Sequence, residues 1–193
     1  MDANAKVRLV ADSSPMQTLE EKVQDLEKRL AQVEGQVAED RLALVVFSGD
    51  LDRVLASFII ATGAAAMGMQ VSMFFTFWGL SVLKKDSLLS GKSLFQKMMV
   101  LMSPGSSKGL PVSKMNYFGV GAKMMRSMMK QKKVSSLEEM ISLARELGVR
   151  MIACEMSRDV FGIQESELVA GLECGGVASF LSDSLKSRTS LFI

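Results

Sequence analysis

The sequence predicts an α/β protein, a doubly wound sheet of about five mostly parallel strands, preceded by an N-terminal coiled-coil-like helix. Short unbroken apolar runs alternate with longer amphipathic segments, as buried parallel strands alternate with the helices that cover them. Gly, Ser and Asp residues follow several of the runs and mark turns. We therefore expect a helical segment at 1–40 and an α/β domain at 41–193, with strands near 42–47, 69–75, 149–153, 168–173 and 189–193.

The N-terminal segment carries the pattern of a coiled coil. Ser14 and Pro15 offer a helix start, a capping serine followed by proline at the first helical position. Spacings of four and three then alternate between apolar residues, which is the a/d pattern. These residues are Leu19, Val23, Leu26, Leu30, Val33 and Val37. Either the helix pairs with another copy, which predicts a homo-oligomer, or it lies on its own domain.

Residues 54–83 form an apolar run without a charged residue. The run is long enough to be a transmembrane candidate. However, 64–68 resembles a helix that ends at a glycine, and 70–77 is rich in β-branched and aromatic residues. We therefore expect a helix near 51–67 followed by a buried strand, in a soluble βαβ unit. Asp50 or Asp52 is expected to cap that helix, and Trp78 either packs under a loop or lines a pocket.

The middle of the chain is basic and rich in methionine. Residues 84–117 contain no regular pattern and are centred on a Ser/Pro/Gly loop at 103–109. Residues 121–133 then predict a helix with methionine pairs on one side and basic residues on the other. Methionine suits an adaptable contact surface, so this helix is expected to be a lid or a partner face. Peripheral contact with membrane lipid is the alternative.

Cys154 is the first candidate for chemistry. A predicted strand, 149–153, runs directly into Cys154, and a short helix that ends at Gly162 follows. Open α/β sheets bind ligands at the carboxyl ends of their strands. The amides and the dipole of the helix would lower the pKa of a thiol placed there and increase its thiolate fraction. The alternative is a buried structural cysteine.

Several other strand ends are expected to meet Cys154 in one crevice. The predicted pocket residues are Asp50, Trp78, Ser157, Arg158, Gly175 and Gly176. Arg158, one turn into the helix, could stabilise a Cys154 thiolate, although Glu155 opposes it. If the strands before Cys154 and Cys174 are neighbours, the second thiol comes within disulfide reach. The two glycines either form a nest for an anion or allow close packing of a helix on a strand.

Composition excludes several kinds of site. The chain of 193 residues has a net charge of +2, two cysteines and no histidine. A Ser-His or Cys-His pair, a zinc site with histidine, a four-cysteine zinc site and a CxxC motif are therefore excluded. Neither GxGxxG nor a P-loop occurs, so we expect no cofactor and no metal. The charge does not favour nucleic acid, and the N-terminus lacks the apolar core of a signal peptide, which predicts a cytoplasmic protein.

Two segments carry a family resemblance. ALVVFSGDLDRVLASFIIATGAAAMGMQVSMFFTFWGLSVLKK and MIACEMSRDVFGIQESELVAGLECGGVASFL resemble the DsrE/DsrF-like family, over about Leu42 to Leu181. The resemblance implies a flavodoxin-like three-layer domain that oligomerises and works with other sulfur-relay proteins. In such proteins a cysteine accepts sulfur as a persulfide and passes it on, and the match places this role on Cys154. Cys174 matches no family function.

Persulfide relay fits the residues that the chain contains. It requires an exposed thiolate but no histidine, metal or nucleotide. We therefore expect a sulfur carrier or sulfurtransferase. The alternatives are a thiol–disulfide redox protein that uses Cys154 and Cys174, and a non-catalytic oligomeric scaffold.

Overall fold

The computed structural model describes residues 15–34, 38–85, 92–114 and 116–193. The chain divides into two compact units, residues 1–37 and 38–193. The first contains α1 (Pro15–Glu34). Leu19, Val23, Leu26 and Leu30 of the predicted a/d pattern are exposed on this helix. Ser14, Val37 and the side chain of Val33 lie outside the described part.

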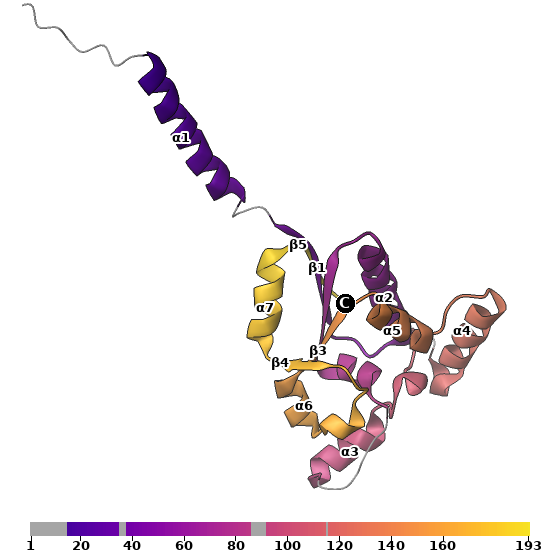
Figure 1. Ribbon diagram of the computed structural model, residues 1–193. Helices are drawn as coiled ribbons and strands as arrows, with labels where there is room; N and C mark the ends of the chain where they lie inside the picture. The colour runs from indigo at the N-terminus through magenta and orange to yellow at the C-terminus, as the bar shows by residue number, and fades with distance from the viewer. Residues whose placement is uncertain (1–14, 35–37, 86–91, 115) are drawn as a thin grey trace, which may run out of the picture. The chain divides into compact units, whose positions relative to one another are not determined.

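The second unit is a parallel α/β sheet, as predicted (Figure 1). Its strand order is β4-β3-β2-β1-β5, and each neighbouring pair is parallel. The strands that contain Cys154 and Cys174, β3 and β4, are neighbours in the sheet. The strands are β1 (Glu39–Val46), β2 (Gln70–Phe75), β3 (Arg150–Cys154), β4 (Glu173–Gly175) and β5 (Ser187–Phe192).

Helices cover both faces of the sheet. Figure 1 shows α2 (Leu51–Ala66) and α5 (Leu137–Glu146) on one side and α7 (Val177–Lys186) on the other. A capping box between Ser136 and Glu139 begins α5. The remaining helices are η1 (Phe77–Leu83), α3 (Leu94–Met102), η2 (Ser107–Gly109), η3 (Tyr117–Gly119), α4 (Val120–Gln131), α6 (Glu155–Phe161) and η4 (Glu165–Glu167).

The apolar run at 54–83 folds as predicted into helix and strand. It supplies most of α2, all of β2 and the 3₁₀ helix η1. Among the helices in the described part of the chain, none combines the length and the apolar character needed to cross a membrane. Most of this run is buried inside the domain, although Ile59, Ile60, Met67 and Trp78 are exposed.

The two faces of the sheet bury very different amounts of apolar surface. On the α2–α5 face, Phe58 of α2 is fully buried and lies 6.0 Å, ring centre to ring centre, from Phe75. Most buried residues of the domain belong to this core. The α7 face has a much smaller core of Phe74, Ile152 and Cys154, with the half-buried Phe180 of α7 packed against it. All of α7 is described, and none of its residues is buried.

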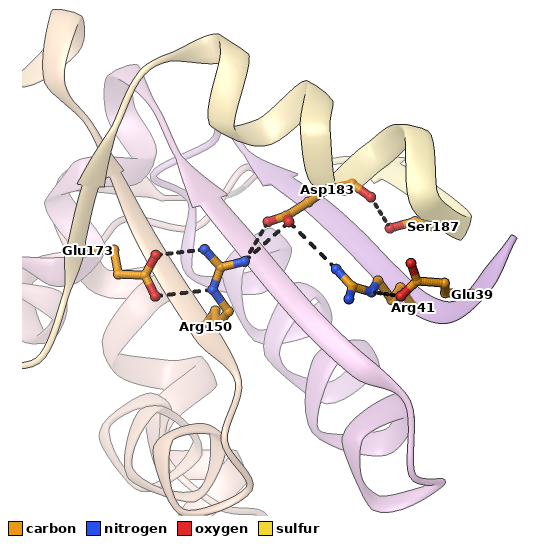
Figure 2. Close-up of polar contacts among 6 residues, drawn as sticks. All are labelled: Glu39, Arg41, Arg150, Glu173, Asp183 and Ser187. Atoms are coloured by element: carbon orange, nitrogen blue, oxygen red, sulfur yellow. Dashed lines mark hydrogen bonds and ion pairs between the residues drawn. The ribbon is translucent and has the colours of Figure 1, made fainter. Parts of the chain in front are cut away.

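Ion pairs connect α7 to the amino end of the sheet (Figure 2). Arg150 of β3 donates two hydrogen bonds to Glu173 of β4, at 2.7 and 3.1 Å, and also contacts Asp183 of α7 at 2.9 Å. Asp183 also lies 4.0 Å from Arg41 of β1. One carboxylate of α7 thus contacts two strands, β3 and β1.

The predicted strand at 168–173 is wrong except for its last residue. Leu168 makes only an isolated antiparallel bridge with Lys84, and the sheet strand begins at Glu173. The preceding turn is held away from the sheet because Glu167 is fully buried and accepts hydrogen bonds of 2.8 and 2.9 Å from Lys92. The left-handed backbone of Gly171 then interrupts an extended conformation. Helix α3 lies in a region where no regular element was predicted.

Candidate functional site

Cys154 lies where the chain changes from strand to helix. It is the last residue of β3 and the residue that precedes the first turn of α6. Its backbone is extended, with φ −67° and ψ 116°, and the helix begins at Glu155. The sulfur therefore lies at the carboxyl end of the sheet and at the amino end of a helix, as the sequence predicted.

Two buried hydroxyl groups accompany the thiol. Thr76 follows the end of β2, the strand beside β3, and Ser157 lies in the first turn of α6. Their oxygen atoms are 2.9 Å apart, and the side chain of Ser157 is completely buried. Cys154, Thr76 and Ser157 thus form a small polar group under an otherwise apolar cover.

This polar group lowers the pKa of Cys154. Burial is the largest single influence and raises the pKa of the thiol, because a thiolate loses solvation inside the protein. Opposing it are the Ser157 hydroxyl and amide, then the Thr76 hydroxyl and the Met156 amide, which together outweigh burial. The sulfur forms no capping hydrogen bond of standard geometry, yet these donors favour its charged form. The pKa therefore lies below the ordinary value of 9.0.

The expectation of an exposed thiol at Cys154 is wrong. Its side chain is only 4% exposed, because Phe74, Ile152 and Phe180 pack around it. Cys174, in contrast, is exposed. A reagent in solution therefore meets Cys174 first and reaches Cys154 only when its cover moves.

Arg158 contacts the other cysteine. Its guanidinium donates a hydrogen bond of 3.3 Å to the sulfur of Cys174, not to the Cys154 thiolate that it was expected to stabilise. The reason is the pairing of β3 with β4, which brings β4 beside α6. Arg158 also lies 3.7 Å from Asp159, which offsets part of its charge.

The two thiols lie on opposite faces of the sheet. Cys154 pairs with Gly175, and Cys174 pairs with Ala153, one residue earlier. Because side chains alternate between faces along a strand, Cys174 points away from the face that holds Cys154. Both cysteines are free. This arrangement counts against a redox function that would require a Cys154–Cys174 disulfide.

Asp50 and Trp78 line a separate pocket. It has a volume of about 270 Å³ at the carboxyl end of β1, and its lining includes Phe47, Asp50, Arg53 and Trp78 but not Cys154. Asp50 precedes α2 without forming a side-chain cap; its carboxylate accepts a hydrogen bond from Ser48 at 3.0 Å. The predicted crevice is therefore divided into a thiol site and this pocket.

An aromatic cluster beside the thiol site was not predicted from the sequence. The rings of Trp78 and Phe161, at the end of α6, have centres 5.4 Å apart, and Phe77 lies 6.3 Å from Phe161. Phe77 has a left-handed backbone, with φ 47°, which is costly for a bulky residue. Thr76 was not among the predicted pocket residues, although its segment was expected to end in the same crevice. Its position directly after the strand beside Cys154 was the signal that could have identified it.

Gly175 allows close packing of α7, whereas a Cβ atom at Gly176 would meet no neighbouring atom. A Cβ atom at Gly175 would lie 2.8 Å from the hydroxyl oxygen of Ser179 and 3.3 Å from Ile152, so a larger residue there would force neighbouring side chains of α7 and β3 to shift. Gly176 precedes the first turn of α7 in extended backbone. Of the two readings of these glycines, the geometry of Gly175 favours close helix–strand packing. In the described part of the chain, no cluster of three or more potential metal ligands occurs.

Three known proteins are similar to this chain over most of its length. The chain is 42% identical over 154 residues to the uncharacterized protein YrkE of Bacillus subtilis, covering 79% of this chain and 96% of that protein. It is 37% identical over 158 residues to the sulfur carrier protein DsrE2 of Allochromatium vinosum, covering 80% and 99%. The crystal structure of the ychN protein from E. coli matches with a TM-score of 0.49 and 11% identity, over 79% of this chain and 98% of that one.

The family assignment follows from a match to most of the chain. The sequence model of the DsrE/DsrF/DrsH-like family matches residues 38–192, which is the α/β unit from β1 to β5, and α1 lies outside it. This match confirms the family resemblance seen in the sequence, and one relative, DsrE2, is named a sulfur carrier. The chain belongs to the DsrE/DsrF/DrsH-like family.

Proposed function

We propose that this protein is a sulfur carrier that holds sulfur as a persulfide on Cys154 and passes it to a thiol of a partner protein. The observation that carries the proposal is the thiol at the junction of β3 and α6, where Ser157, Thr76 and the helix amides lower its pKa. Membership of the family and the relative named as a sulfur carrier support the same role. Cytoplasmic location stays a prediction.

The chemistry needs only thiolates. The Cys154 thiolate attacks the outer sulfur of a donor persulfide, R–S–SH; a new S–S bond forms, the old one breaks, and the donor leaves as the thiolate R–S⁻. Delivery repeats the exchange, with an acceptor thiolate attacking the outer sulfur and Cys154 leaving as a thiolate. No oxidant or reductant is consumed. The hydroxyl groups that lower the pKa of Cys154 increase the fraction of the thiol that is present as the thiolate nucleophile. They also make Cys154 a better leaving group when the sulfur is delivered.

Burial of Cys154 requires an opening step, and the structure offers a small one. The cover consists of Phe180 from α7, a helix with no buried residue, and of Phe74 and Ile152 from the sheet. Few apolar contacts have to break to expose the sulfur on this face, and such regions open at low free energy. Burial between transfers would protect a bound persulfide from other thiols.

Sulfur uptake can be followed by intact-protein mass spectrometry after exposure to inorganic polysulfide. Four proteins should be compared: the natural chain, Cys154→Ser, Cys174→Ser and the double variant. We expect the mass of one added sulfur atom on the natural chain and on Cys174→Ser, removed by reductant, and none stably held on Cys154→Ser.

The matched cysteine makes the outcome decisive. Cys174 is exposed, and its sulfur accepts a hydrogen bond from Arg158. It therefore serves as a control for unspecific uptake of sulfur by an accessible thiol. Uptake that persists in Cys154→Ser and disappears in Cys174→Ser would move the carrier role to Cys174. Uptake by neither cysteine would contradict sulfur transfer and leave the non-catalytic scaffold.

A further inference from the structure

Helix α1 presents an apolar stripe that is exposed in the described chain. Leu19, Val23, Leu26 and Leu30 are between 46% and 66% exposed and follow one another at spacings of four, three and four. Spacings of this kind place the four side chains on one side of a helix. Helices in proteins owe most of their stability to the packing of an apolar face against another element. Something therefore covers this stripe in the working protein.

The charges of the residues beside the apolar stripe indicate which surface packs against it. With Val23 and Leu30 at position a and Leu19 and Leu26 at position d, the flanking e and g positions are fixed. Position e holds Glu20 and Glu27, whereas position g holds Lys22 and Arg29. All four side chains are exposed. One flank of the stripe is therefore acidic and the other flank basic.

The acidic e positions and basic g positions favour pairing with a second copy of α1 in the parallel orientation. In a parallel pair of helices, position g of one copy faces position e of the next heptad in the other. Lys22 then meets Glu27 of the second copy, and each pair forms twice by symmetry. In an antiparallel pair, g faces g and e faces e, so lysine and arginine would meet each other and glutamate would meet glutamate.

We propose that α1 pairs with α1 of a second copy of this chain, parallel and in register. Leucine at both described d positions suits such packing. The family model begins at residue 38, so this contact is an addition of this chain to the family domain. A parallel pair carries both α/β domains at its carboxyl end, which would bring two thiol sites into one particle. The pairing itself does not depend on the proposed sulfur chemistry.

Cysteine crosslinking of the full-length chain tests the pairing and its direction. In a Cys154→Ser, Cys174→Ser background, three variants are compared under mild oxidation: Leu30→Cys in the stripe near one end, Leu19→Cys near the other, and Lys28→Cys on the opposite side of the helix. Residues that face each other across a parallel pair lie within disulfide range, so Leu30→Cys should form covalent dimers about tenfold faster than Lys28→Cys.

Mixing the two stripe variants distinguishes the orientations. With a mass label on one of them, the parallel pair predicts disulfides between identical positions. Preferential Leu19→Cys to Leu30→Cys disulfides would show an antiparallel pair and overturn the proposal. Equal, slow crosslinking of Leu30→Cys and Lys28→Cys would also overturn it and would favour a helix that lies on its own domain.

A charge exchange supplies an independent check in the Leu30→Cys background. Glu27→Lys places lysine opposite Lys22 of the second copy and should slow crosslinking. Adding Lys22→Glu restores opposite charges at the same pair and should restore the rate. An unchanged rate in Glu27→Lys, or no recovery in the double variant, would contradict the assigned parallel register.

Discussion

The two faces of the sheet differ in how they are covered, and the Cys154 thiol lies on the less covered one. The α2–α5 face buries Phe58, Phe75 and many other apolar side chains in one continuous core. The α7 face buries Phe74, Ile152 and Cys154 beneath the half-buried Phe180. The first face holds most of the apolar area removed from water and thus most of the stability of the domain. The second combines a buried thiol with a small apolar cover.

Charge is distributed unequally as well. At the amino end of the sheet, Arg150, Glu173 and Asp183 form exposed or partly exposed ion pairs that hold α7 and β4 in place. At the carboxyl end, Cys154 has neutral partners, the hydroxyl groups of Thr76 and Ser157. Neutral donors can lower the pKa of the thiol without placing a fixed positive charge beside it. The attachment of α7 and the tuning of the thiol are thus separate features of the structure.

The largest contrast is expected between truncations of two phenylalanines. Phe58→Ala should lower the free energy of unfolding by about 3–5 kcal/mol, because it leaves a cavity in the α2–α5 core. Phe180→Ala should cost about 1 kcal/mol or less, since this ring is only half buried, and it should speed alkylation of Cys154. Urea denaturation gives the first comparison, and labelling in a Cys174→Ser background gives the second. Equal losses of stability would contradict the difference between the faces.

The next effect concerns the thiolate. Ser157→Ala removes the first of the contacts that lower the pKa of Cys154, so the pKa should rise towards or above the ordinary 9.0. Ultraviolet absorbance of the thiolate, followed against pH in Cys174→Ser protein, measures this directly. A titration of Cys154 that is unchanged by Ser157→Ala would show that the hydroxyl does not act on the sulfur.

The same pKa shift gives stability a defined pH dependence. Because the folded pKa of Cys154 lies below the unfolded one, the thiolate stabilises the folded protein fully above the unfolded pKa. This contribution is lost as the pH falls through the folded pKa. Relative to Cys154→Ser, the Cys174→Ser protein should therefore gain stability as the solution is made alkaline. An unfolding free-energy difference that stays constant over this range would contradict the lowered pKa.

The smallest effect is expected at the amino end of the sheet. Glu173→Gln should cost less than about 1 kcal/mol, because the pair with Arg150 is about half exposed and is screened by solvent. Arg150 lowers the pKa of Glu173, so the pair contributes above the ordinary value of 4.5 and its contribution is lost as the pH falls through the lowered pKa. Urea midpoints of natural and Glu173→Gln protein should converge in acid. A larger loss at neutral pH would mean that this network, more than apolar packing, retains α7.

Much of the fold could be predicted because its signals are local. The apolar runs of β1, β2 and β3 and the glycine after α6 each lie within a few residues of the element that they define. The strand predicted at 168–173 failed for a different reason. Burial of Glu167 depends on Lys92, which lies 75 residues away in the sequence, and no local pattern reveals that pairing.

For the candidate site, too, only the local features could be predicted from the sequence. The position of Cys154 before a helix, with Ser157 in the first turn, is a local feature, and it carries the lowered pKa. Burial of the thiol arises from Phe74 and Phe180, which belong to distant segments. The contact of Arg158 with Cys174 depends on the register of β4 against β3. Local chemistry could therefore be predicted, whereas accessibility and long-range partners could not.

The most direct test of the central claim is the rate at which Cys154 takes up sulfur in Cys174→Ser protein, measured by intact mass against low concentrations of urea. If Cys154 is the carrier and the α7 face opens locally, one sulfur atom should be added in the absence of urea, at a rate that hardly changes until global unfolding begins. A rate that rises in proportion to the globally unfolded fraction, or no uptake by the folded protein, would contradict a carrier function for Cys154.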